Sequence, residues 1–102
     1  MNGQRLLMIS SEDNVATALD NIKAGTEAAV RSGRETSYLK ALEEIPFGFK
    51  MACEDIARGS AVIKYGSPIG IASVPIRKGE LVHVHNLRGV RAGTGQAESE
   101  RK

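Results

Sequence analysis

The chain has 102 residues, which fits one domain with a modest hydrophobic core. Its 14 basic and 12 acidic residues leave a net charge of +2, too balanced for a protein that acts by neutralising a nucleic-acid backbone. Aromatic residues make up only 4% and tryptophan is absent. The core must therefore be built from Val, Ile, Leu and Ala, a composition that suits small β-architectures with many tight turns.

No segment resembles a targeting or membrane-spanning sequence. The apolar run near the N-terminus, residues 6–9, is shorter than the hydrophobic region of a secretory signal. No stretch approaches the roughly 20 apolar residues that a spanning helix needs. Cys53 is the only cysteine, so no intramolecular disulfide can form. We expect a soluble, cytoplasmic protein that binds neither membranes nor nucleic acid.

The first two elements are predicted to be strands. Residues 5–9 form the first, and residues 15–19 form the second after a polar turn rich in Ser, Asp and Asn. Val15, Thr17 and Leu19 would share one face of the second strand. A helix over residues 12–24, capped by Asp13, is the alternative. We prefer the strand because of the turns that follow.

A glycine turn preceded by an isoleucine occurs three times. Ile22-Lys23-Ala24-Gly25, Ile56-Ala57-Arg58-Gly59 and Ile76-Arg77-Lys78-Gly79 each lead into an apolar stretch. Such a turn combines an apolar anchor with a glycine able to adopt positive φ. The glycines are 34 and 20 residues apart, and these unequal intervals exclude a solenoid repeat.

The segments between these turns are predicted mainly as strands. Residues 31–34 form a turn and residues 35–39 a strand, while residues 40–45 form a strand or a helical turn that ends before Pro46. Residues 47–52 are extended, and residues 53–56 hold at most one helical turn. Residues 92–102 have almost nothing apolar to bury, so we predict a domain over residues 1–91 and a disordered polar tail after it.

The last predicted strand carries both histidines of the chain. In a strand over residues 81–85, His83 and His85 point to one side while Val82 and Val84 form the opposite, apolar face. Two imidazoles do not complete a metal site, which needs at least a third protein ligand. His83 and His85 would be metal ligands only with carboxylates or with groups of a partner, and a plain polar strand face is the alternative.

Four motifs follow one another in a fixed order along the chain. They are Asp13-Asn14-Val15-Ala16, Ile45-Pro46-Phe47-Gly48-Phe49-Lys50, Lys64-Tyr65-Gly66-Ser67-Pro68-Ile69-Gly70 and Val82-His83-Val84-His85-Asn86. Together they resemble the small N-terminal domain of altronate and galactarate dehydratases and the free-standing small subunit of sulfolactate sulfo-lyase, over about residues 6 to 90. The resemblance implies a SAF-type or β-clip fold, mainly β, with short bent strands and at most one or two helical turns.

The chain departs from the family pattern at two positions. Ser10 stands where the family has the histidine of I-H-P, and Phe49 stands where it has the histidine of G-H-K. Ser10 can still form hydrogen bonds, whereas Phe49 can only pack. Two imidazoles that could serve proton transfer or metal binding are therefore missing.

The resemblance implies the small subunit of a two-component lyase, a dehydratase of a sugar acid or related hydroxy acid. A large dehydratase-like subunit would complete the site, and any divalent metal would be held mainly by that subunit. A homo-oligomer is compatible with this role. The alternatives are a sulfolactate sulfo-lyase small subunit and a stand-alone carbohydrate- or protein-binding or assembly module without catalytic activity. The expected substrate-binding residues are Lys50, Lys64, Tyr65, Gly66, His83, His85 and Asn86.

Overall fold

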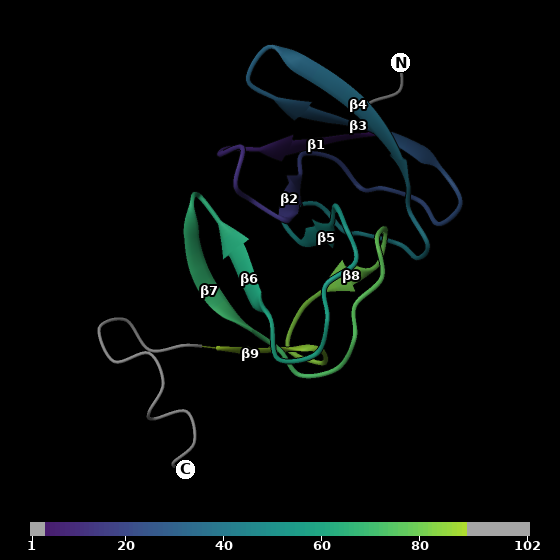
Figure 1. Cartoon of the computed structure of the whole chain (residues 1–102). Coiled ribbons are helices and arrows are strands. Elements are labelled where there is room, and N and C mark those ends of the chain that lie inside the picture. Colours follow the sequence, from purple (N-terminus) through teal and green to yellow (C-terminus); the bar gives the residue numbers. More distant parts are fainter. Residues whose placement is uncertain (1–3, 90–102) are drawn as a thin grey trace.

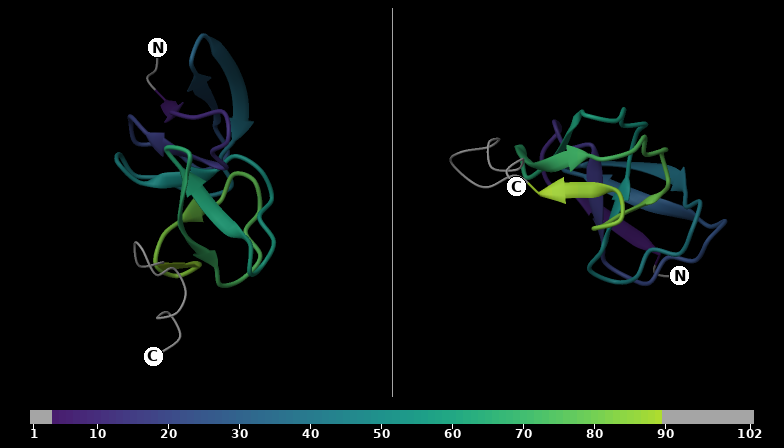
Figure 2. Two further views of the ribbon diagram at one scale, coloured as in Figure 1. Left: turned by 60° about the vertical axis from the view of Figure 1, so that its left-hand side comes forward. Right: turned by 90° about the horizontal axis from the view of Figure 1, so that it is seen from below.

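The computed structural model of the protein describes residues 4–89, and every regular element in this range is a β-strand (Figures 1 and 2). The mainly β fold is confirmed, and neither segment allowed for a helical turn, residues 40–45 or 53–56, forms one. The predicted tail at residues 92–102 lies outside the described residues. The strands are β1 (Arg5–Met8), β2 (Val15–Ala18), β3 (Glu27–Ser32), β4 (Glu35–Lys40), β5 (Lys50–Ala52), β6 (Ala61–Lys64), β7 (Ser67–Ala72), β8 (Leu81–Val82) and β9 (Leu87–Gly89).

The strands form two sheets. The larger has the order β4-β3-β1-β2-β5-β8, and the smaller has the order β6-β7-β9. Neighbouring strands are antiparallel except for β1 and β3, which run parallel. In Figure 1 the strands β1 to β4 form the upper part of the molecule, and β6, β7 and β9 lie below them. Since β5 and β8 complete the larger sheet, both halves of the chain are needed to build it.

The second strand is confirmed over the helical alternative, and both of its faces are covered. Val15 packs in one core cluster, Ala16 and Ala18 pack in another, and Thr17 is only half-buried. The strand lies between two clusters, so residues pointing to either side of it are buried. A single apolar face is what a strand shows when only one side is covered.

The predicted strand over residues 81–85 is wrong beyond its second residue. Strand β8 ends at Val82, and residues 83–86 form a bend and turn before β9. Val82 is fully buried as expected, whereas Val84 is 79% exposed and takes no part in the core. The alternation of apolar and polar residues there does not correspond to a strand.

The isoleucine–glycine turn occurs four times, and the structure pairs the copies. The missed copy is Ile45-Pro46-Phe47-Gly48. Ile22 bridges Ile45 and Ile56 bridges Ile76, and all four glycines have φ between 85° and 94°. Each glycine N–H donates to an alanine carbonyl four residues before the isoleucine of the paired copy. The complete unit is therefore Ala-x-x-x-Ile-x-x-Gly, found at residues 18–25, 41–48, 52–59 and 72–79.

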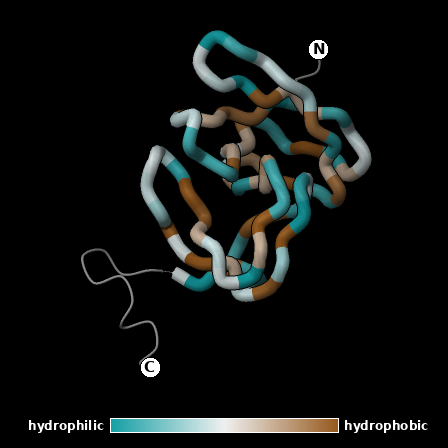
Figure 3. Tube along the Cα trace, in the orientation of Figure 1, coloured by the Kyte–Doolittle hydropathy of each residue, from teal (hydrophilic) through white to brown (hydrophobic). Residues whose placement is uncertain are grey.

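Two clusters of small aliphatic side chains form the core. Figure 3 shows hydrophobic stretches within the two sheets and a hydrophilic outer end on the β3–β4 hairpin. The clusters meet along β2 and β5, because Val15 and Ala52 are register partners in one cluster while Ala16 and Met51 are register partners in the other. The first cluster contains Leu6, Ala16, Ala18, Ile22, Ala28, Val30, Ala41, Ile45 and Met51, and the second contains Val15, Ala52, Ile56, Val62, Ala72, Ile76 and Val82.

Candidate functional site

The turn between β6 and β7 carries two of the predicted site residues. Tyr65 and Gly66 both have positive φ, 58° and 76°. Two consecutive residues of this kind make the type I′ turn that suits a two-residue hairpin. A non-glycine residue such as Tyr65 is uncommon in this conformation. Its side chain is 59% exposed, so the turn presents an aromatic ring to the surface.

Asp13 holds this turn against the loop after β1. The N–H of Gly66 donates to Asp13 Oδ1 at 2.8 Å, and the N–H of Ser10 donates to Asp13 Oδ2 at 3.0 Å (Ser10 is the position where a histidine was expected). A Cβ built on Gly66 would lie 3.4 Å from Ser10 Oγ, so the two loops are in close contact. From the sequence, Asp13 was expected as part of a motif or as the cap of the alternative helix. Its spacing of three residues from Ser10 is the local signal that it caps its own turn.

Asp13 is ionised in the folded protein in spite of its burial. Only 6% of the residue is exposed, and burial by itself would raise the pKa of the carboxyl. Hydrogen bonds from the backbone N–H groups of Ser10, Gly66, Tyr65 and Ile9 outweigh burial and lower the pKa below its usual 3.8. Both oxygens of the carboxylate accept hydrogen bonds from backbone N–H groups. The carboxylate therefore orders the two loops and is not free to act as a base.

Lys50 and Lys64 are near enough for their charges to interact, and Lys64 directly precedes this turn. Lys50 begins β5 and Lys64 ends β6, and both are half-buried. Burial lowers the pKa of Lys50, and the charge of Lys64 lowers it further. Lys64 Nζ lies 4.6 Å from the centroid of the Tyr65 ring, in the range of a cation–π contact. Two ammonium groups that repel each other, with an aromatic ring alongside, form a place where an anion is favoured.

The histidines lie on a separate loop. The His83 ring packs on Phe49 with centroids 4.8 Å apart and an angle of 58° between the planes. Both His83 and His85 are exposed. Within residues 4–89, no hydrogen bond, ion pair or ring contact joins either imidazole to Lys50 or Lys64. The structure therefore brings the two lysines together with Tyr65 and Gly66. The histidine loop begins beside Lys50, because Lys50 is the register partner of Val82.

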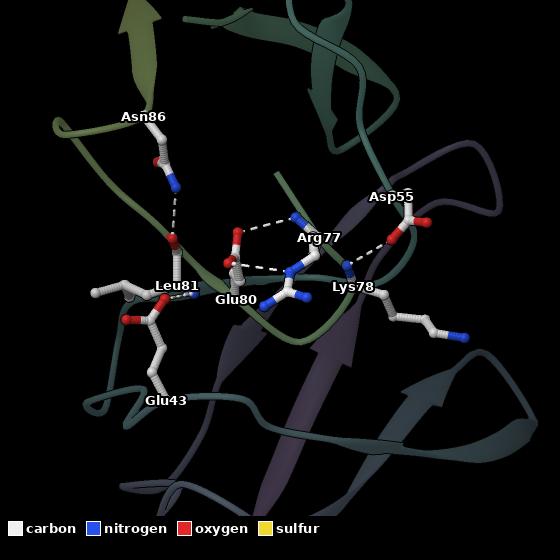
Figure 4. A network of polar contacts seen from close by, with 7 residues as sticks. All are labelled: Glu43, Asp55, Arg77, Lys78, Glu80, Leu81 and Asn86. Carbon is white, nitrogen blue, oxygen red and sulfur yellow. Dashed lines mark hydrogen bonds and ion pairs between the residues drawn. The ribbon is translucent and has the colours of Figure 1, made fainter. Parts of the chain in front are cut away.

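Asn86 is a structural residue of the histidine loop. It is 4% exposed, its Oδ1 accepts from the N–H of His83 at 2.9 Å, and its Nδ2 donates to the carbonyl of Leu81 at 2.8 Å. Figure 4 shows this amide beside Leu81, whose own N–H donates to Glu43. Side chains thus bind both backbone groups of Leu81. Asn86 closes the turn that ends β8 and positions His83.

The described residues supply no metal site and no reactive thiol. In residues 4–89, no group of three or more His, Cys, Asp or Glu side chains lies together as metal ligands would. Residues 4–89 therefore offer no complete set of ligands for a divalent metal. Burial and the nearby charges of Glu54 and Asp13 raise the pKa of Cys53 to about 12, so its thiol stays protonated. The same range contains no helix long and apolar enough to cross a membrane.

Comparison with known proteins decides the family. The family described as altronate/galactarate dehydratase SAF domain matches residues 4–90. The chain belongs to this family. Altronate dehydratases of Escherichia coli (strain K12) and Bacillus subtilis (strain 168) are 44% and 35% identical to this SAF domain over 82 residues. The (2R)-sulfolactate sulfo-lyase subunit alpha of Chromohalobacter salexigens is 43% identical over 56 residues.

The SAF domain matches only a small part of the dehydratases. Each of those two matches covers 80% of this chain and 16% of the relative, whereas the match to the sulfo-lyase subunit covers 55% of this chain and 60% of the subunit. The chain therefore spans about 16% of the length of the dehydratases it resembles. Most of each dehydratase has no counterpart here.

Proposed function

We propose that this SAF domain is the small subunit of a two-component lyase acting on a sugar acid or related hydroxy acid. The observation that carries the proposal is the pair of half-buried lysines, Lys50 and Lys64, beside the turn that Asp13 holds. A carboxylate bound between them would relieve their mutual repulsion. The family and the named subunit alpha of a sulfo-lyase support an acidic substrate and a multisubunit enzyme.

The lysines would act on charge that develops during the reaction. Removal of the proton next to the substrate carboxylate leaves an enolate, whose negative charge nearby cations stabilise. Departure of the β-substituent, a hydroxide in dehydration or sulfite in desulfonation, then completes the elimination. The base and the acid that assists the leaving group would come from the large subunit, since the Asp13 carboxylate is already bound by backbone donors.

Exposed apolar residues next to the lysines support a partner that covers them. Ile9 and Tyr65 lie on the two loops that Asp13 joins, and they are 53% and 59% exposed. Large apolar side chains exposed together are typical of interaction sites. A large subunit seated there would exclude water from the lysines and strengthen their interaction with a carboxylate.

The test is reconstitution with the large subunit, identified by co-purification with the tagged chain from its native cells. We expect no turnover of altronate, galactarate or sulfolactate by the chain alone, and turnover of one of them by the complex. Lys50→Gln and Lys64→Gln should each raise KM by about tenfold or more, because each removes a charge-assisted contact. Substrate affinity should also fall as pH rises through the pKa of Lys50, which lies below 10.5.

Lys23→Gln is the matched control, because Lys23 is an exposed turn lysine remote in sequence from both site lysines. It should leave KM unchanged. Turnover by the highly purified chain alone, or equal KM in all three variants, would refute the proposed role. Recovery of a partner with no lyase activity would favour the stand-alone binding or assembly module.

A further inference from the structure

A hollow lies at the opposite end of the β6–β7 hairpin from the lysine pair. It has a volume of about 340 Å³ and is lined by Arg58, Gly59, Ala72, Ser73 and Arg88. Gly59 and Ala72 are joined by a backbone hydrogen bond of 2.8 Å at the base of the hairpin, and Tyr65 and Gly66 form its tip. At about 3.3 Å per residue, the six residues between base and tip separate the two places by roughly 20 Å. The base of this hairpin lies next to β9 in Figure 1.

The small residues of the repeated turn create the hollow. Arg58 precedes the glycine of the third Ala-x-x-x-Ile-x-x-Gly unit, and Arg88 lies on β9 opposite Ile71. Gly59 has no side chain, and the side chain of Ala72 is buried in the second core cluster. A Cβ added at Gly59 would have no neighbour within 4 Å, so the space above the turn is open. Ser73, which carries a hydroxyl, is the other polar lining residue.

The charges of this hollow are not balanced by the described part of the chain. Within residues 4–89 no carboxylate forms an ion pair with Arg58 or Arg88, in contrast to the pairs Arg5–Asp20 and Arg77–Glu80. The backbone N–H groups of Gly59 and Ser73 already donate to Ala72 and Asn86. Recognition of a ligand would therefore depend on the two guanidinium groups and the Ser73 hydroxyl, all of which donate hydrogen bonds.

From this arrangement we infer a second anion-binding site, formed by Arg58, Ser73 and Arg88, for a small organic carboxylate or phosphate ester. Guanidinium groups bind both kinds of oxyanion in bidentate fashion. The volume lies within the range of small-molecule pockets. The site shares no residue with the lysine pair, so it would bind its ligand whether or not the proposed lyase function is correct.

Amide chemical shifts of the full chain, titrated separately with inorganic phosphate and with malate at low ionic strength, test the inference. We expect saturable shifts at Gly59, Ala72 and Ser73. Arg58→Gln and Arg88→Gln should each weaken binding by about tenfold or more. Both residues are exposed, and retention of the remaining amide shifts will show that the variants are folded.

Two control variants make the outcome specific. Arg34→Gln removes an exposed arginine from the β3–β4 turn, and Lys64→Gln removes a charge from the other site. With either probe, both variants should show the same saturable amide shifts at Gly59 and Ser73 as the parent chain. Saturation by phosphate alone would identify a phosphate ligand, and saturation by malate alone would identify a carboxylate ligand. No saturable shift with either probe, or equal weakening by Arg34→Gln, would overturn the inference.

Discussion

Asp13 is a charged residue with 6% of its surface exposed, and its two oxygens join loops that are 53 residues apart in the chain. Its partners are backbone N–H groups, which cannot move away without disturbing the loops themselves. An ionised carboxylate accepts such bonds more strongly than a neutral amide does. The geometry of the proposed site at the lysine pair therefore depends on the charge of Asp13, which would not touch the ligand itself.

Asp13→Asn should lower the free energy of unfolding by about 1–3 kcal/mol at pH 7, because an amide NH₂ would face a backbone donor. The pKa of Asp13 is lower in the folded chain than its usual 3.8, so its ionisation stabilises the fold above that pH. This stabilisation is lost as pH falls through the lower, folded-state pKa. The difference between variant and parent should therefore shrink in urea melts at and below pH 3.8.

Asp20→Asn is the control for this prediction. The pKa of Asp20 is also lowered, first by the hydrogen bond from Arg5, but this pair lies at the surface. Its loss should change stability less than Asp13→Asn does. A difference between Asp13→Asn and the parent that persists unchanged to pH 2 would contradict the role assigned to the carboxylate.

The four Ala-x-x-x-Ile-x-x-Gly units are alike in backbone conformation but differ in what surrounds their glycines. Gly25 lies in open space, whereas a Cβ at Gly79 would run into the carbonyl oxygen of Lys40 and lie 3.1 Å from Leu42 Cγ. The carbonyl of Gly79 also accepts from the N–H of Leu42 at 2.8 Å. The fourth unit therefore packs directly against the second, and this contact joins the two pairs of turns.

Comparing the stabilities of Gly25→Ala and Gly79→Ala separates the cost of backbone strain from the cost of a packing clash. Both place an L-residue at positive φ, which costs roughly 1–2 kcal/mol. Gly79→Ala should lose more, because its new methyl group meets backbone that cannot yield. Thermal and urea unfolding of the two variants measures the difference. Equal losses would show that the contact between the second and fourth units is looser than the structure indicates.

The two sheets are held together by Asn14 as well as by the core. Its Nδ2 donates to the carbonyl of Ala61 at 3.0 Å, and its Oδ1 accepts from the N–H of Ile63 at 2.7 Å. Its backbone N–H donates to Ile63, and its carbonyl accepts from Cys53. One buried residue thus connects β6 of the small sheet to β2 and to the segment after β5 of the large sheet.

Asn14→Ala should lower the free energy of unfolding by about 1–3 kcal/mol, since it leaves two backbone groups of β6 without partners. Hydrogen exchange should report the loss mainly in β6 and β7, with β1 and β3 less affected. Asn21→Ala is the control, because Asn21 is exposed and accepts only from Phe47 N–H among the hydrogen bonds found in residues 4–89. Equal loss of protection in both sheets would argue against a joint at Asn14.

Local chemistry was sufficient to predict most of the turns and strands. The glycines of the repeated turns need positive φ whatever surrounds them, and the first two strands follow from short apolar runs between polar turns. The fourth turn, at Ile45, was missed because Pro46 was considered only as the end of a preceding element. Comparing the alanine spacing of all four units would have found it, because that spacing is present in the sequence.

The sequence by itself determined a mainly β chain of glycine turns and the family to which the chain belongs. Conformational preferences are local properties of the residues, and the order of the motifs can be read directly from the sequence. The end of β8 at Val82 follows from the local turn that Asn86 closes, whereas the bond from the N–H of Leu81 to Glu43 was decided by tertiary structure. The approach of Lys50 to Lys64 was decided in the same way. They are fourteen positions apart in the chain, and their charges interact because Asn14 and the second core cluster fix β6 against β2 and β5.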